Sequence, residues 1–258
     1  MSNGLAASAR CHRFVTDEPD IPFTLPVLYE DERIIVVDKP HFLASMPRGM
    51  WYRQTVLMRA RQQFGEQVTL AHRLDRLTAG VLVLVRDPQF RGAYQTLFEQ
   101  RRTTKIYECL APLKPARRPP TGTVRALEPP RSFPLERRSR IVKMRGVLQA
   151  REQRGQVNAV TLIEREELAP GITVADGRAV ARYRLHPCTG KTHQLRVHMN
   201  SLGLPMLNDP WYPRVLDVPY DDFSRPLALV ARELQFVDPV SGETKMFISE
   251  QPLLANRT

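Results

Sequence analysis

The segment HRLDRLTAGVLVLVRD, residues 72–87, contains one aspartate, Asp75, between Arg73 and Arg76. Neighbouring guanidinium groups lower the pKa of a carboxyl group and keep it ionised even where it is partly removed from water. An ionised carboxylate in a dry site can act as a nucleophile, or can stabilise a glycosidic carbon that develops positive charge. Asp75 is therefore a candidate catalytic residue. Taken alone, however, this segment favours the simpler interpretation of a structural Arg–Asp ion pair at a turn.

The sequence pairs no second acid with Asp75. An ordinary glycosidase needs a second carboxyl group to protonate the leaving oxygen. A nitrogen-linked base such as uracil can leave as a delocalised anion and makes a smaller demand for that acid. A catalytic Asp75 would therefore suit a nucleoside better than a sugar chain.

A second polar cluster lies in TGKTHQLRVHMNSLG. Its pattern predicts a Thr-capped helix over residues 192–201 that a glycine closes. Residues three and four apart are neighbours on a helix, so His193, Arg196 and Asn200 share one face. If Arg196 points inward, it completes a cluster of positive charge around Asp75. The alternative is that Arg196 contacts solvent or the edge of a sheet.

Hydrophobic patterning predicts the elements that position these residues. An unbroken apolar run at 81–85 indicates a strand buried on both faces. The other expected strands are 34–37, 104–112, 158–166, 178–187 and a closing hairpin around the turn 238–242, and the expected helices are 54–64 and 88–102. Strands and helices are mixed without a regular βαβ alternation, which favours an α+β domain with a largely antiparallel or mixed sheet.

The chain is strongly basic. Its 258 residues include 38 Lys and Arg against 27 Asp and Glu, a net charge of +11. Such an excess favours a polyanionic partner, because basic side chains neutralise phosphates and release their counterions. Charge alone does not distinguish DNA, RNA and acidic membranes, and a basic protein without such a partner is the open alternative.

Much of this charge lies in residues 114–145, where ten basic residues face Glu128 and Glu136 alone. The first part of the segment is also rich in proline, which argues against regular structure. We therefore expect a basic, Pro-rich surface insertion at about 112–146, with Arg137 and Arg138 among its contacts to a polyanionic partner. A solvated insertion without a partner is the alternative.

Several classes of protein find no support in the sequence. It contains no membrane-spanning apolar stretch and no signal peptide. Cys11, Cys109 and Cys188 form no CxxC pair, which fits reduced thiols in a cytoplasmic protein. Nucleotide-binding glycine loops and metal-binding motifs are also missing, so we expect no cofactor, no nucleotide and no metal.

Taken together, the motifs resemble those of the RluA-type pseudouridine synthases. HRLDRLTAGVLVLVRD is similar to the signature of that family, and HPCTGKTHQLRVHMNSLGLPMLNDPWY is similar to its second block. VLYEDERIIVVDKP, KIYECLAP and RPLALVARELQFVDPVSGE resemble its opening strand, its Lys-x-Tyr strand and its closing hairpin. These five blocks follow the family order across residues 27–245.

The resemblance implies a single α+β catalytic domain over residues 23–258, with a mixed, mainly antiparallel, bisected sheet flanked by helices. Residues 1–22 are expected to form a flexible lead. Because the first block begins near residue 27, we expect a stand-alone catalytic domain without the N-terminal S4-type RNA-binding domain that many relatives carry.

The resemblance also implies roles for individual residues. Asp75 would be the catalytic aspartate, Arg196 would pair with it, Arg73 would insert into the RNA stack in place of the flipped uridine, and Tyr107 would lie against the target base. An aromatic platform for a flipped base contributes roughly 1–3 kcal/mol, although without the resemblance the sequence favours a half-buried strand tyrosine at Tyr107. Further RNA contacts are expected from Arg76, Lys191, His193, Arg137 and Arg138.

The sequence therefore predicts a monomeric, cofactor-free RNA pseudouridine synthase acting on ribosomal or transfer RNA, without a membrane partner. A catalytically silent RNA-binding protein on the same fold is the alternative, but the intact Asp75, Tyr107 and Arg196 argue against it. A third possibility is an N-glycosylase, which would release free base.

Overall fold

The computed structural model describes residues 18–115, 118–173, 177 and 179–254. One mixed sheet runs through this part of the chain, in the order β1-β2-β4-β11-β5-β10-β9-β7-β6, with β12 on β11, β3 on β4 and β8 on β7. The strands are β1 (Val27–Glu30), β2 (Ile34–Lys39), β3 (Thr69–Leu70), β4 (Ala79–Val85), β5 (Thr103–Pro112), β6 (Thr123–Ala126), β7 (Leu135–Val142), β8 (Arg151–Gln153), β9 (Ala159–Thr173), β10 (Ala179–Pro187), β11 (Leu229–Val237) and β12 (Thr244–Ile248). The helices are α1 (Val56–Phe64), the 3-10 turn η1 (Pro88–Phe90), α2 (Arg91–Glu99) and α3 (Gln194–Ser201).

Among the described strands, β4 and β11 form the one parallel pair, so the predicted mixed, mainly antiparallel α+β sheet is confirmed. This parallel pair is short, because it joins only Val230 to Ala79 and Ala231 to Gly80. Gly80 has φ 116°, and a Cβ atom there would lie 2.3 Å from the carbonyl oxygen of Ala231. Glycine thus permits the close approach of the two backbones at the junction between the two halves of the sheet.

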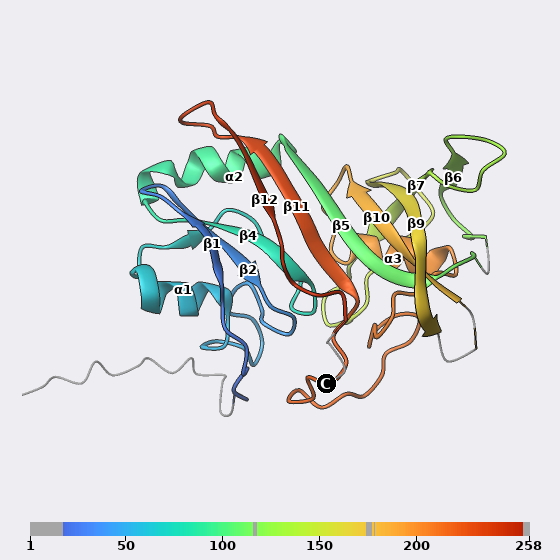
Figure 1. The fold of residues 1–258 in the computed structure, drawn as a ribbon, viewed down its shortest axis with the longest axis horizontal. Helices are drawn as coiled ribbons and strands as arrows, with labels where there is room; N and C mark the ends of the chain where they lie inside the picture. The colour runs from blue at the N-terminus through green and yellow to red at the C-terminus, as the bar shows by residue number, and fades with distance from the viewer. Residues whose placement is uncertain (1–17, 116–117, 174–176, 178, 255–258) are drawn as a thin grey trace, which may run out of the picture.

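The first half of the sheet is organised around β4, all seven of whose residues are buried. Its side chains alternate between two faces. Leu82 and Leu84 pack with Val56 of α1, whereas Val83 packs with Tyr94 of α2. Figure 1 accordingly shows α1 and α2 on opposite sides of this part of the sheet. The unbroken apolar run predicted this arrangement correctly.

Helix α1 also ends where its sequence predicts. The Thr55 side chain accepts a hydrogen bond from the backbone N–H of Met58, which satisfies one of the free donors at the helix start. Gly65 closes the helix with φ 106°, and its N–H donates to the carbonyl of Arg61. The structure thus confirms the predicted helix over 54–64, with its start moved to Val56.

The second half of the sheet comprises β5, β10, β9, β7 and β6, and α3 packs against it (Figure 1). Leu195, Met199 and Leu202, on and just after α3, lie in one apolar cluster with Tyr183 and Leu185 of β10. The predicted antiparallel pair 158–166 and 178–187 is confirmed as β9 and β10, and the closing hairpin as β11 and β12.

The predicted lack of regular structure in the Pro-rich first part of the basic segment is wrong for β6, and the expected surface insertion also contains the sheet strand β7. These strands pair with each other, and β7 also pairs with β9. Along β7, Leu135, Arg137, Ser139 and Ile141 are buried and the residues between them are more exposed. This is the period-two pattern of a strand. The sequence analysis missed it because it counted Arg137, which lies on the buried face, as a surface charge.

Most of the predicted flexible lead, residues 1–17, lies outside the described residues. The residues that follow are packed against the domain. The Glu18 carboxylate accepts hydrogen bonds from the backbone N–H groups of Tyr52, Arg53 and Gln54 at 2.7–2.8 Å, and Ile21 is buried. In the described part of the chain, no helix has the length and apolar character needed to cross a membrane.

Candidate active site

A large open cleft lies where the two halves of the sheet meet, with a volume of about 3070 Å³. Pockets for small ligands usually hold roughly 300–1,000 Å³, so this cleft suits a macromolecular substrate. The loop before β4, the start of α3 and the segment from Pro205 to Leu227 contribute to its walls. The cleft brings together Arg73, Asp75, Arg76, Tyr107, Lys191, His193 and Arg196, all of them candidate residues from the sequence.

The loop between β3 and β4 holds Asp75. Ser45 fixes this loop, because its hydroxyl donates to the carbonyl of Leu74 at 2.7 Å and accepts from the N–H of Leu74 at 3.0 Å. The N–H of Thr78 donates to the carbonyl of Asp75 and closes the turn. Leu74 and Leu77 are buried on either side, while the Asp75 side chain is 37% exposed. The turn thus presents the carboxylate to the cleft.

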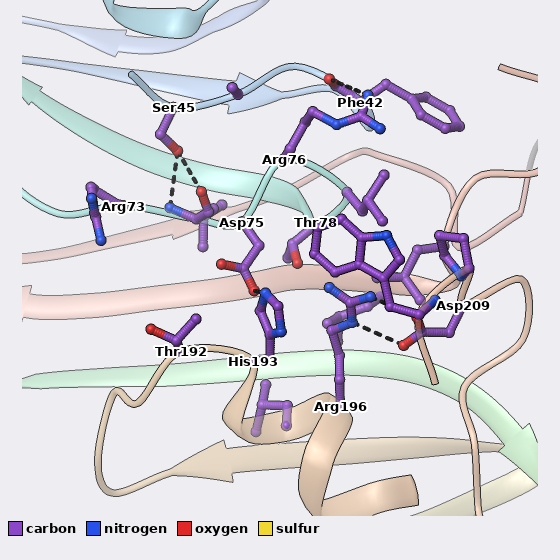
Figure 2. A pocket seen from close by; sticks show the side chains of 18 of the residues that line it. Phe42, Ser45, Arg73, Asp75, Arg76, Thr78, Thr192, His193, Arg196 and Asp209 are labelled. Carbon is purple, nitrogen blue, oxygen red and sulfur yellow. Dashed lines mark hydrogen bonds and ion pairs between the residues drawn. The ribbon is translucent and has the colours of Figure 1, made fainter. Parts of the chain in front are cut away.

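The two flanking arginines do not clamp Asp75, which corrects the prediction from the sequence. Figure 2 shows both side chains directed away from the carboxylate. Arg73 is exposed, with Nη1 3.5 Å from the sulfur of Met46. The Arg76 guanidinium lies 5.1 Å from the ring centre of Trp51. The tight turn sends adjacent side chains in different directions, so proximity in sequence gave no ion pair.

Lys39, at the end of β2, supplies a positive charge that the sequence analysis missed. It is fully buried, and its ammonium donates to the carbonyls of Pro40, Leu43 and Arg76 at 2.7–3.2 Å. Burial and the charge of Arg76 lower the pKa of Lys39 to about 7, while the negative charge of Asp75 opposes this shift. The signal available in the sequence was a lysine at the end of a strand whose other residues, apart from Asp38, are apolar.

The resemblance implied that Arg196 pairs with Asp75. In the structure the partner of Arg196 is instead Asp209. Its Nε and Nη2 donate to the two oxygens of this carboxylate at 2.9 and 2.6 Å, and both side chains are buried. The guanidinium lies 4.7 Å from the ring centre of Trp211 and 5.2 Å from that of Tyr212. Burial lowers the pKa of Arg196, but the hydrogen bonds and charge of Asp209, with the charge of Asp75, outweigh this effect and raise it.

One nitrogen of this arginine remains available. Within the described part of the chain, Nη1 of Arg196 is buried and has no hydrogen-bond partner. Buried donors are nearly always paired, so this atom is suited to a substrate oxygen or to the carboxylate of Asp75. Asp209 was missed because it lies on a loop 13 residues after Arg196. Its only signal was an acid within the NDPWY motif.

Tyr107 lies at the centre of the sheet, on β5, opposite Leu185 of β10 and Ala231 of β11. It contacts apolar clusters from both halves of the sheet and lines the cleft. Burial raises the pKa of its phenol, and the negative charge of Asp75 raises it further. Tyr107 therefore presents a neutral aromatic ring near Asp75.

His193 is the side chain that the structure places beside Asp75. Its Nε2 lies 3.9 Å from Oδ2 of Asp75, and its Nδ1 lies 3.1 Å from the hydroxyl of Tyr212 (Figure 2). The predicted helix over 192–201 begins only at Gln194, because His193 has a left-handed backbone conformation, φ 56° and ψ 19°. Burial lowers the pKa of His193 to about 4, against the attraction of Asp75.

The other expected RNA contacts differ among themselves. Lys191 is exposed at the cleft. Arg138 is exposed, 3.6 Å from Glu136, and lies outside the cleft lining. Arg137 is fully buried and bonded to Glu152 at 2.6 Å. The prediction that Arg137 contacts RNA is therefore wrong, since an inward-facing strand position places it in the interior.

A comparison with known protein families matches residues 33–201 to the RNA pseudouridylate synthase family. The dual-specificity RNA pseudouridine synthase RluA of Vibrio vulnificus is 31% identical over 224 residues, which cover 86% of this chain and 81% of that protein. The mitochondrial tRNA pseudouridine(32) synthase of Saccharomyces cerevisiae is 28% identical, covering 81% of this chain and 41% of the yeast protein.

A solved structure, human RNA pseudouridylate synthase domain containing 1, has the same fold. Its TM-score is 0.60 with 24% sequence identity, and the match covers 92% of this chain and 87% of the human chain.

Proposed function

This chain belongs to the RNA pseudouridylate synthase family, and from that premise we propose that Asp75 is its catalytic carboxylate. The chain is an RNA pseudouridine synthase, an isomerase that acts on RNA. The resemblance drawn from its five sequence blocks is thereby confirmed, as is the predicted enzyme class. The roles of single residues, developed below, are our proposals.

One observation carries the assignment of Asp75: of the two aspartates beside Arg196, it alone is free to act. The Asp209 carboxylate is buried, and Arg196 and backbone N–H groups occupy its oxygens. The Asp75 side chain is 37% exposed, and among the described residues its carboxylate has one polar partner, His193, whose Nε2 lies 3.9 Å from Oδ2. The negative charge of Asp75 also acts to raise the pKa values of Lys39 and Tyr107. This free, exposed carboxylate supports the proposal that Asp75 meets a nucleoside that enters the cleft.

The reaction balances without a co-reactant. The bond between N1 of uracil and C1′ of the ribose breaks, the base turns, and a bond from C5 to C1′ forms. The proton on C5 leaves and N1 gains one, so that substrate and product are isomers. Asp75 attacks the sugar or the base, and the neutral ring of Tyr107 supports the detached uracil by stacking.

The target uridine must leave its helix or loop to reach Asp75. Extruding a base costs a few kcal/mol, least where it is already unpaired. We propose that the exposed side chain of Arg73, on the loop that holds Asp75, fills the space that the base leaves. Lys191 and Arg76, which also line the cleft, supply positive charge toward the phosphates.

One of these relatives is named as a dual-specificity RNA enzyme and the other as a transfer RNA enzyme. We propose that the substrate of this chain is ribosomal or transfer RNA. The monomeric state, the cytoplasmic location and the absence of a cofactor stay predictions from the sequence.

The test uses ribosomal and transfer RNA transcripts, with pseudouridine mapped as carbodiimide adducts. We expect wild-type protein to form pseudouridine without loss of uracil, and Asp75→Asn to abolish turnover while RNA binding survives. The matched control is Asp221→Asn, an exposed aspartate outside the cleft lining, which should retain activity. Full activity of Asp75→Asn would remove Asp75 from the mechanism. Free uracil would indicate an N-glycosylase, and binding without product a silent RNA-binding protein.

A further inference from the structure

His193 occupies an unusual position at the cleft. It is a non-glycine residue in the left-handed region, φ 56°, directly before α3, and its side chain makes no capping bond to the helix. Such conformations are strained in residues other than glycine and are often found where a side chain has a function. The ring is buried, with its centre 5.1 Å from that of Trp211 and 5.9 Å from that of Tyr212. The backbone and both aromatic neighbours therefore hold the imidazole in one orientation.

The hydrogen bonds of Tyr212 determine which nitrogen of His193 carries the proton. A tyrosine hydroxyl has a single proton. Tyr212 donates this proton to the carbonyl of Ala150 at 2.8 Å, since a carbonyl can only accept. At its 3.1 Å contact with Nδ1 of His193 the hydroxyl must therefore accept, so that Nδ1 carries the hydrogen. In the neutral ring, Nε2 then has no proton and presents a lone pair.

That lone pair faces the cleft beside the Asp75 carboxylate. Nε2 and Oδ2 of Asp75 lie 3.9 Å apart, and neither of them can donate in these protonation states. No donor to Nε2 is found within the described residues. Burial and the charges of Arg196 and Lys143 outweigh the attraction of Asp75 and Asp209 and keep the pKa of His193 low, about 4. At neutral pH the site thus holds two acceptors side by side and calls for a donor from the substrate.

We propose that Nε2 of His193 accepts a hydrogen bond from the 2′-hydroxyl group of the target uridine and so makes the site selective for ribose over deoxyribose. This inference rests on the proposed role of Asp75 at the reacting nucleoside. The 2′-hydroxyl is the group by which a protein distinguishes RNA from DNA at a given position.

The position of Nε2 favours the ribose over the base. With Asp75 at the anomeric carbon, the nearest donor of the substrate is the hydroxyl on the adjacent carbon C2′. The N3–H group of uracil lies beyond C2, on the part of the ring that is remote from the ribose. A contact with the 2′-hydroxyl can persist through the whole reaction, because the ribose stays in place while the base rotates.

The experiment is a double-mutant cycle between the enzyme and its substrate. Binding is measured in an Asp75→Ala background, so that the RNA is not converted. Two oligonucleotides differ only at the target, which is uridine or 2′-deoxyuridine. We expect the deoxy target to bind roughly tenfold more weakly, the effect of one neutral hydrogen bond and its unpaired acceptor. His193→Phe should weaken binding of the ribose target by a similar factor. It should leave binding of the deoxy target unchanged.

The inference would be overturned by a His193→Phe variant that keeps the full preference for ribose, so that the two losses simply multiply. A third oligonucleotide carries 3-methyluridine at the target. Coupling of His193 to that methyl group instead of the 2′-hydroxyl would assign the contact to the base and equally overturn the proposal.

A 2′-fluoro target tests the same inference if His193→Phe fails to fold. Fluorine takes the place of the hydroxyl and leaves the sugar without a donor at this position. We expect this target to bind about as weakly as the deoxy target, and binding as tight as that of the uridine target would contradict the proposal. His186→Phe, on β10 and outside the cleft lining, is the matched control that should keep the preference. Pseudouridine formation by the wild-type chain is measured separately, so failure of this inference and failure of the proposed function are distinguishable.

Discussion

The two halves of the sheet are stabilised in different ways. Around β4 the interior is mostly apolar, with Leu82, Leu84 and Val83 packed between α1 and α2, and the buried Lys39 lies at the end of the neighbouring β2. Around β7 and α3 the interior also contains charged and polar groups, such as the buried pair Arg137–Glu152. The first arrangement is visible in a sequence as a run of apolar letters. The second depends on partners that are distant in the chain, so its sequence resembles an exposed surface.

The largest expected effect tests the buried ion pair. Arg137→Met leaves the Glu152 carboxylate, whose side chain is 8% exposed, without its cation. Breaking a buried pair in this way typically costs about 3–5 kcal/mol. We expect a loss of that size in the free energy of unfolding, measured by urea denaturation.

The double variant Arg137→Met with Glu152→Leu sharpens the comparison, since replacing both partners with apolar groups is often neutral. It should recover most of the lost stability. If the double variant is as unstable as Arg137→Met, the pair does more than neutralise its own charges, and the hydrogen bonds of Arg137 to the carbonyls of Thr121 and Thr123 become the leading explanation.

In the apolar half, Leu84→Ala should lower the free energy of unfolding by about 2–5 kcal/mol, through lost burial and a cavity. Leu84 is fully buried in an apolar cluster with Val56 and Ala60 of α1. The loss should therefore be the same at pH 5.5 and pH 7.5. A loss that changes strongly between these pH values would show that the two halves are less distinct than described.

The pH dependence of stability provides a smaller effect in the polar half. His198 is buried between the hydroxyls of Ser139 and Thr161, and burial together with Arg137 lowers its pKa to about 3. Below pH 6.5 the unfolded chain binds a proton at this residue that the folded chain does not, so stability falls as the pH falls from 6.5 toward 3.

One such group contributes at most about 1.4 kcal/mol per pH unit. The pKa values of His41, His72 and His193 are also lowered, so the total slope reflects several histidines. We expect His198→Gln to have a shallower slope between pH 6 and pH 4.5 than the wild type in urea denaturation. An unchanged slope would mean that His198 does not titrate in the way described.

The smallest effect concerns the end of a helix in the apolar half. Thr55→Ala removes the side-chain acceptor for the N–H of Met58, and such a change costs about 1 kcal/mol. Thr55→Ser keeps the hydroxyl and is the matched control. A loss in Thr55→Ser equal to that in Thr55→Ala would assign the effect to the buried methyl group instead of the cap.

The accuracy of the sequence predictions follows the same division. Strand β4, helix α1 and the closing hairpin were predicted because local patterns of apolar and turn residues determine them. Strand β7 was missed because its pattern includes Arg137, whose partner Glu152 belongs to another strand.

Within the site, the position of Asp75 in the cleft could be predicted from its motif. The directions of Arg73 and Arg76 and the choice of Asp209 by Arg196 could not, because turn geometry and a separate loop decide them.

The narrow contact between β4 and β11 has a consequence for redesign. Gly80 is five residues from Asp75, and any side chain there would meet the backbone of Ala231. A methyl group at this position would clash with Ala231, so that β4 and β11 would have to separate and the width of the cleft would change. Substitutions that make room for a bulkier nucleoside are therefore better placed at exposed residues of the cleft lining, because the contact between β4 and β11 has no space for an added atom.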